Sequence, residues 1–160
     1  MEIKQTVRAF TYRGSSVLSK LQTDVEVHSD IRTDHSEHSL VWKAVWDTGA
    51  TNTCISHRLV NDLHLISTGK IMTRTANELV ETDVYCIDIV LPNKLTIKDV
   101  RAQALDLYEC DLLIGMDIIR FGDFSVTTNN GKTIFSFRTP SVKHIDFVKE
   151  LDEQEKALKL

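Results

Sequence analysis

Asp47 ends an apolar run in AVWDTGATNTCIS, residues 44–56, and is followed directly by Thr48 and Gly49. A carboxylate in an apolar setting is costly unless it is protonated, paired or hydrogen-bonded. Glycine lets the backbone turn sharply, so neighbouring amides can donate to the carboxylate while the Thr48 hydroxyl secures the loop. The pattern indicates a turn that presents Asp47 to a reaction. The alternative is a turn aspartate that only caps local amides.

A single carboxylate is a poor catalyst of hydrolysis. Cleavage of a peptide bond without a metal or a covalent intermediate needs one group to take a proton from water and another to give one to the carbonyl oxygen. Two carboxylates can share one proton for this purpose, because like charges about 3 Å apart cannot both ionise. The sequence contains one Asp-Thr-Gly and no Asp-Ser-Gly, so the second carboxylate would come from a second copy of the chain. Asp111 and Asp117 are the alternatives within the chain.

Short alternating runs dominate the sequence around this motif. Val25 and Val27 alternate in residues 17–31, and residues 84–91 and 134–137 follow similar patterns. Turn residues separate the runs, and the Asn130-Gly131 pair is a strong hairpin signal. The nearly continuous apolar runs 40–46 and 111–119 are consistent with strands buried on both faces. Only residues 56–65 and the tail have a helical pattern, so an all-β fold is predicted.

The tail differs in kind from the rest of the chain. From about Ser141 onward, apolar residues recur among many charges at helical spacing, namely Ile145, Val148, Leu151 and Leu158. We therefore expect one domain over residues 1–140 and an amphipathic helical tail over 141–160. The tail would cap the domain, extend a subunit contact or fray in solution. Residues 30–39 are polar and predict a surface loop between strands.

Composition excludes several classes of protein. Apolar residues make up 42% and charged residues 26% of the chain, which is ordinary for a globular protein. A net charge of −4 offers no basic stripe for nucleic acid, and no apolar run approaches the roughly 18 residues of a membrane span. The N-terminus has no secretory h-region. Three cysteines, an odd number, suit a reducing compartment, so a cytoplasmic location is expected.

The stretch VWDTGAT, residues 45–51, resembles the active-site loop of the retropepsins, the retroviral-type aspartic proteases. Three further features strengthen the resemblance: Val45-Trp46 before the aspartate and Ile55-Ser56 after it, CDLLIGMDII at 110–119, and a hairpin pattern at 70–93. CDLLIGMDII is similar to the second signature of the family, and residues 70–93 have the place of its flap. The resemblance spans residues 20–138, and GMDIIRFGDFSV with GKTIFSFR is similar to bacterial cellular members more than to viral ones.

The resemblance implies a retropepsin-like acid protease fold: a closed, barrel-like all-β domain with a flap hairpin and one short helix after each signature. It implies an aspartic endopeptidase that is active as a homodimer on a peptide or protein substrate, without metal or other cofactor. Asp47 would be the catalytic carboxylate of each chain. Thr48 would hydrogen-bond across the dimer beneath the two aspartates, while Gly49 and Ala50 would line the floor and meet the substrate backbone.

The same resemblance assigns the flap and the second signature. Thr75, Ala76 and Asn77 would lie at the flap tip and contact the peptide from above. Viral flap tips are commonly glycine-rich, whereas this turn is Thr-Ala-Asn-Glu; asparagine adopts the left-handed conformation that a tight turn needs. Ile114 and Gly115 would form the second signature, where Gly115 permits close packing behind the Asp47 loop. Asp117 would then belong to a structural helix.

Other groups of reactive residues favour simpler interpretations. His35 and His38 invite a metal site, but no third and fourth ligands follow at the usual spacing, so a solvated loop is favoured. Cys54 and His57 suggest a thiol nucleophile and its base, but no orienting group follows, so a small buried cysteine is favoured. Two further pairs of residues have ordinary structural interpretations. Trp42 and Trp46 would belong to the core or an interface, and Arg74 and Glu78 would be solvated flap charges.

Two other functions are compatible with the same sequence. The fold would serve as a non-enzymatic module that binds peptides or organises a dimer, a role that does not require the acid. Alternatively, the protease would process itself, with residues 30–39 or the tail as its own substrate.

Overall fold

The structure is a computed structural model that describes residues 6–29, 40–75 and 78–158. The predicted loop at 30–39, with His35 and His38, lies outside the described residues, as do Ala76 and Asn77. The described residues form these elements in chain order: β1 Arg8–Arg13, β2 Gln22–Ser29, β3 Val41–Trp46, β4 Cys54–Ser56, α1 His57–Asp62, β5 Gly69–Arg74, β6 Leu79–Val90, β7 Thr96–Leu105, β8 Leu112–Ile114, α2 Met116–Ile119, β9 Asp123–Asn129, β10 Lys132–Thr139 and α3 Phe147–Leu158.

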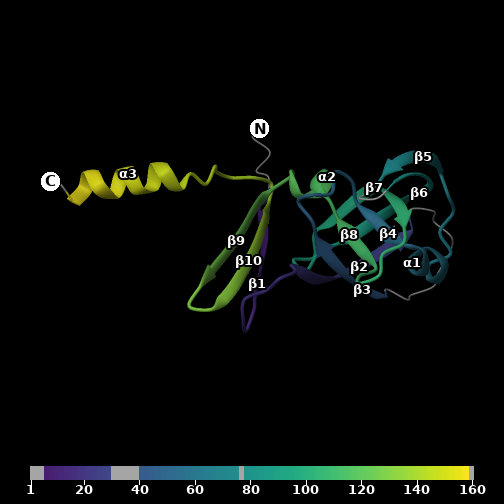
Figure 1. The fold of residues 1–160 in the computed structure, drawn as a ribbon, viewed down its shortest axis with the longest axis horizontal. Coiled ribbons are helices and arrows are strands. Elements are labelled where there is room, and N and C mark those ends of the chain that lie inside the picture. Colours follow the sequence, from purple (N-terminus) through teal and green to yellow (C-terminus); the bar gives the residue numbers. More distant parts are fainter. Residues whose placement is uncertain (1–5, 30–39, 76–77, 159–160) are drawn as a thin grey trace.

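Six strands close into a β-barrel, which lies beside a smaller three-stranded sheet (Figure 1). The strand order around the barrel is β2-β3-β8-β4-β7-β6, and pairing of β2 with β6 completes the circle. β6 has two neighbours on the same side because it is long: residues 87–90 pair with β2 and residues 79–84 pair with β5. The predicted all-β, barrel-like fold and the hairpin within residues 70–93 are confirmed.

Strand alternation builds the barrel core. Val25 and Val27 of β2 are 2% and 1% exposed, as their alternation predicts. β3 also alternates, since Trp42, Ala44 and Trp46 are buried whereas Val41 and Lys43 are exposed. The two tryptophans are therefore core residues.

The expectation that runs 40–46 and 111–119 are strands buried on both faces is wrong. A barrel strand turns one face to the core, and the other face of β3 is left at the surface. The second run divides in two: strand β8 ends at Ile114, and helix α2 begins at Met116. The structure changes from strand to helix at Gly115, so the run is not one doubly covered strand. Its buried residues are Leu112 and Ile114 of β8 and Ile118 and Ile119 of α2.

The three-stranded sheet joins the two ends of the domain. β10 lies between β1 and β9, and the predicted hairpin between β9 and β10 is confirmed. Asn130 and Gly131 form its turn with φ values of 51° and 69°, as a type I′ turn requires. Aromatic rings with centroids 5.0 to 6.3 Å apart connect this sheet to the barrel: Phe10, Trp46, Phe124, Phe135 and Phe137. The cluster fixes Trp46, the residue before Asp47.

The helices are short apart from the tail. Ser56 caps α1 by accepting a hydrogen bond from the Leu59 amide at 3.1 Å, in agreement with the helix predicted within 56–65. The predicted tail helix is present as α3, which extends away from the sheet and has no buried residue (Figure 1). None of the helices in the described residues is long and apolar enough to cross a membrane. We propose that the domain ends near residue 140, where the tail begins.

Asp123 anchors the start of the tail to the domain. Its carboxylate accepts hydrogen bonds from the Ser141 hydroxyl, from the Val142 amide at 3.0 Å and from the Arg138 guanidinium at 2.7 Å. These three donors, the Ser141 hydroxyl foremost, hold the pKa of Asp123 well below its usual range. The ionised carboxylate is therefore favoured in the folded protein.

Replacing Asp123 by asparagine will reduce stability in a pH-dependent way. A carboxyl group with a lowered folded-state pKa stabilises the fold above its unfolded pKa of about 3.9 and loses that contribution as the pH falls through its folded pKa. In urea denaturation, the difference in unfolding free energy between the wild type and Asp123→Asn should be largest near neutral pH and should shrink below about pH 4. A difference that is constant from neutral pH to pH 3 would contradict the role of the charge.

Candidate active site

Asp47 directly follows β3 on a turn that leaves its carboxylate half-buried. The Asp47 amide donates to the Ile114 carbonyl at 2.9 Å, so strand β8 fixes the backbone at this point. The Gly49 amide donates to Asp47 Oδ1 at 2.8 Å, as the turn composition predicts. Oδ2 accepts no hydrogen bond within the described part of the chain. One carboxylate oxygen is thus oriented and the other is available.

The rest of the turn faces outward. Thr48 and Gly49 are exposed, and Ala50 is half-buried. The Ala50 amide donates to the Asp47 carbonyl at 3.2 Å and closes the turn. The Thr48 hydroxyl forms no hydrogen bond with the residues that the structure describes, so it does not secure the loop within one chain.

Gly115 lies directly behind the Asp47 loop. A Cβ atom at this position would lie 2.6 Å from the carbonyl carbon and 2.7 Å from the oxygen of Asn52, and 3.0 Å from the Ala50 oxygen. The next two amides then bind the loop, because Met116 donates to the Ala50 carbonyl at 2.8 Å and Asp117 donates to that of Thr51 at 3.1 Å. Only a residue without a side chain permits this approach of two backbones.

The two other aspartates near the site are engaged in structural contacts. Asp117 accepts from the amide and the hydroxyl of Thr53, both at 2.9 Å. Asp111 lies 3.5 Å from the Arg58 guanidinium. Sequence reasoning did not identify Thr53, which is fully buried and connects the loop to α2. Its partner is 64 residues away, so no local pattern indicates the contact.

The predicted flap is a hairpin of β5 and β6. Its tip is closed by Thr75, whose amide donates to the Glu78 carbonyl at 2.8 Å and whose hydroxyl oxygen accepts from the Glu78 amide at 3.1 Å. The two residues between them, Ala76 and Asn77, are not described.

A family model for aspartyl proteases matches residues 37–118, which include the Asp47 loop, the hairpin and α2. The chain belongs to the aspartyl protease family. No curated protein matches the sequence of this chain significantly.

A solved structure shows the fold of this aspartyl protease family member. A retropepsin-like aspartic protease from Rickettsia conorii has a TM-score of 0.52 and 15% identity, covering 86% of this chain and 99% of its own. The similarity to this bacterial protein confirms the predicted retropepsin-like fold. The protease of EIAV in complex with the inhibitor HBY-793 has a TM-score of 0.46 and 19% identity, covering 62% of this chain and 85% of its own.

Cys54 and His57 of this family member do not form a thiol and base pair. Cys54 is 7% exposed, and burial, followed by the nearby charges of Asp117 and Asp47, raises its pKa to about 11. His57 is exposed and lies 3.6 Å from Asp106 instead. Cys54 is therefore a buried cysteine with an unreactive thiol. Among the described residues, no group of three or more potential metal ligands comes together.

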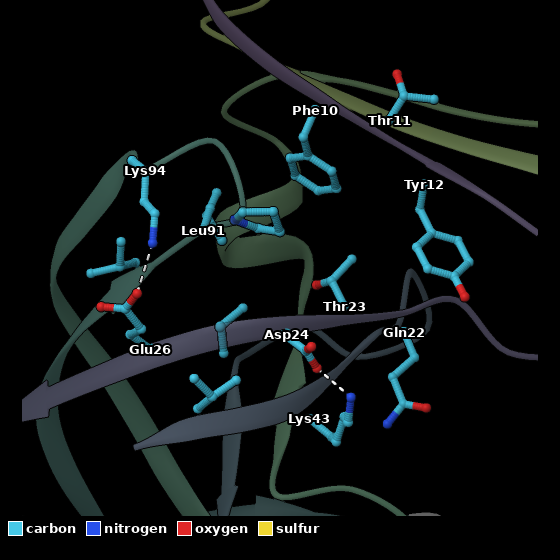
Figure 2. Close-up of a pocket in the computed structure, with 14 residues that line it drawn as sticks. Phe10, Thr11, Tyr12, Gln22, Thr23, Asp24, Glu26, Lys43, Leu91 and Lys94 are labelled. Atoms are coloured by element: carbon cyan, nitrogen blue, oxygen red, sulfur yellow. Dashed lines mark hydrogen bonds and ion pairs between the residues drawn. The ribbon is translucent and has the colours of Figure 1, made fainter. Parts of the chain in front are cut away.

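A hollow of about 520 Å³ lies between β1 and the barrel (Figure 2). The rings of Phe10 and Tyr12 face it from β1, and two ion pairs, Lys43 with Asp24 and Lys94 with Glu26, lie along its floor and rim. No residue of the Asp47 turn lines it. The hollow is therefore separate from the candidate active site of this aspartyl protease family member.

Proposed function

We propose that the protein is an aspartic endopeptidase that acts as a homodimer, in which each chain supplies one Asp47. The observation that carries the proposal is which partners bind the carboxylates of Asp47, Asp111 and Asp117. Asp47 has one oriented oxygen and one available oxygen, whereas Asp111 and Asp117 are held by Arg58 and Thr53. A dyad therefore needs Asp47 of a second chain.

In the proposed dimer, the two Asp47 carboxylates meet across a two-fold axis and share one proton. The ionised carboxylate takes a proton from water, and the protonated one donates to the oxygen of the scissile carbonyl. The Gly49 amide, which donates to Oδ1, orients each carboxylate. The exposed Thr48 hydroxyl is then free to bind the partner's loop beneath the carboxylates.

The substrate is an extended peptide between the Asp47 loops and the two hairpins. Gly49 and Ala50 form the floor, and Thr75, Ala76 and Asn77 contact the peptide from the hairpin tip. Main-chain hydrogen bonds supply part of the affinity, as in other cases where an extended peptide is bound along a strand. Neither metal nor another cofactor takes part. The three cysteines, all free, are in keeping with a cytoplasmic location.

Mixing of subunits tests the dimer directly. Wild-type protein is held at one concentration and titrated with Asp47→Asn protein while cleavage of a fluorogenic peptide library or casein is followed. If subunits pair at random and mixed dimers are inactive, a ninefold excess of the variant should reduce cleavage about tenfold. An excess of Asp62→Asn protein, altered at an exposed position of α1, should instead add to the cleavage.

Cleavage that is unaffected by the Asp47→Asn chains would mean that one chain holds a complete site. If the wild type binds peptides but cleaves none, with or without added pepstatin, the non-enzymatic peptide-binding module is the correct function instead.

A further inference from the structure

A row of side chains crosses the outer face of the barrel from the Asp47 loop to the hairpin. Strand register places these residues next to one another in the order Val45, Leu113, Cys54, Gln103, Val84. Their neighbours in the strands, such as Ala44 and Ile55, point into the barrel core, so the row lies on the opposite face. Asp47 follows Val45 by two residues and continues the same alternation. The row therefore forms a wall between the aspartate and the hairpin.

Gln103 is the polar member of this wall. It is only 4% exposed, and its neighbours Cys54 and Val84 are 7% and 2% exposed. Its backbone belongs to the barrel, since the Gln103 amide donates to the Thr53 carbonyl at 3.2 Å, close behind the Asp47 loop. A carboxamide in such surroundings needs hydrogen-bond partners.

The hairpin supplies one partner. Gln103 Oε1 accepts from the hydroxyl of Thr73 on β5 at 2.8 Å. A second hairpin hydroxyl, that of Thr82 on β6, donates to the Ala104 carbonyl. Both bonds join the inner face of the hairpin to β7, so the hairpin curves over the position of Gln103.

The other end of the carboxamide has no partner. Gln103 Nε2 donates no hydrogen bond within the described part of the chain. Nε2 also retains contact with solvent. Among the described residues, the side-chain nitrogens that are both fully enclosed and without a partner are those of Trp42 and Asn93, and Gln103 Nε2 is not one of them. A donor with these properties, placed by strand register between Asp47 and the hairpin, is available to a ligand bound there.

We propose that Gln103 is a specificity residue that selects peptides with a hydrogen-bonding side chain, a carboxamide or a hydroxyl, at one position beside the scissile bond. The inference rests on the proposed function, since it names the substrate class of the same site. An apolar side chain of equal shape would leave the Gln103 donor unpaired and would be rejected. Thr73 is a positioning residue: by donating to Oε1, it directs Nε2 toward the substrate.

The test uses peptide pairs that differ at a single position by nearly isosteric residues, threonine against valine and asparagine against leucine. Each position next to the scissile bond is scanned in turn. At one position the wild type should prefer the polar member by at least about tenfold in kcat/KM. Gln103→Met should abolish or reverse this preference. Thr73→Val should weaken it and Thr73→Ser should retain it, a pattern that a purely structural role would not produce.

Glu81→Gln is the matched control on the hairpin. Glu81 pairs with Lys70 at 3.2 Å on the exposed face, away from β7, so this variant should keep the wild-type preference. Equal preferences in the wild type, Gln103→Met and Thr73→Val would overturn the inference. Thermal midpoints of all variants show whether each one is folded.

Binding separates this inference from the proposed function. The same peptide pairs are titrated into Asp47→Asn protein with and without Gln103→Met, and fluorescence anisotropy is followed. A polar preference that depends on Gln103 supports the inference even if the wild type cleaves nothing. Cleavage without such a preference overturns the inference alone, and protein that neither binds nor cleaves any peptide overturns both.

Discussion

Asp47→Asn protein should lose peptide cleavage by at least about 10³-fold while it remains folded and dimeric, because neither general-base nor general-acid transfer survives without the carboxylate. The fold should tolerate the change. Asparagine has the same shape, and its Oδ1 can still accept the hydrogen bond that the Gly49 amide gives to Asp47. Single-turnover cleavage of a defined peptide, together with sedimentation and thermal unfolding, measures the three properties separately.

Asp111→Asn is the matched control for this loss. The Asp111 amide donates to the Lys43 carbonyl of β3 at 3.2 Å, but the Asp111 carboxylate contacts Arg58. Its substitution should therefore leave kcat unchanged. Undiminished cleavage by folded Asp47→Asn protein would disprove the mechanism. Loss of cleavage in Asp111→Asn but not in Asp47→Asn would place the acid within the chain instead.

Gly115→Val should damage the active site from behind. The added Cβ would meet the backbone of Asn52 at 2.6 and 2.7 Å, and a backbone cannot rotate out of the way as a flexible side chain does. The loop must move, at a cost of about 1–3 kcal/mol or more in unfolding free energy. Because Met116 and Asp117 bind the same loop, kcat should fall by an order of magnitude or more even in the fraction that is folded.

Gly131→Ala is the control for Gly115→Val, because it should lower stability without affecting catalysis. Gly131 has a φ of 69° in the β9–β10 turn, and a Cβ there meets no atom within 4 Å. The variant should lose about 1–2 kcal/mol through backbone strain, with kcat per folded molecule unchanged. If Gly115→Val and Gly131→Ala lose stability and activity to the same degree, close packing at Gly115 has no special relation to catalysis.

Local patterns predicted the parts of the molecule that depend on neighbours in sequence. Alternation located β2 and β10, and the Asn130-Gly131 turn located the hairpin of β9 and β10. The apolar run ending at Asp47 located the candidate catalytic loop. The pattern failed where burial depends on the closed barrel. The run at 40–46 is apolar at nearly every position, yet only one of its faces meets the core.

Contacts between distant segments had no signal in the sequence. Thr53 meets Asp117 across 64 residues, and Thr73 meets Gln103 across 30. Both pairs consist of ordinary polar residues that acquire their roles from strand register and from the curvature of the hairpin. Asp123 is similar, since two of its donors, Ser141 and Val142, lie at the start of the tail, which approaches β9. Strand register is a property of the folded sheet, so the roles of these residues could be identified only from the structure.

The aromatic cluster behind Asp47 draws on residues from both ends of the domain: Phe10 from β1, Trp46 from β3, and Phe124, Phe135 and Phe137 from β9 and β10. A nascent chain that has already exposed Asp47 outside the ribosome still lacks the strands that hold Trp46. We therefore expect the proposed peptidase activity to begin only after β10 has left the ribosome.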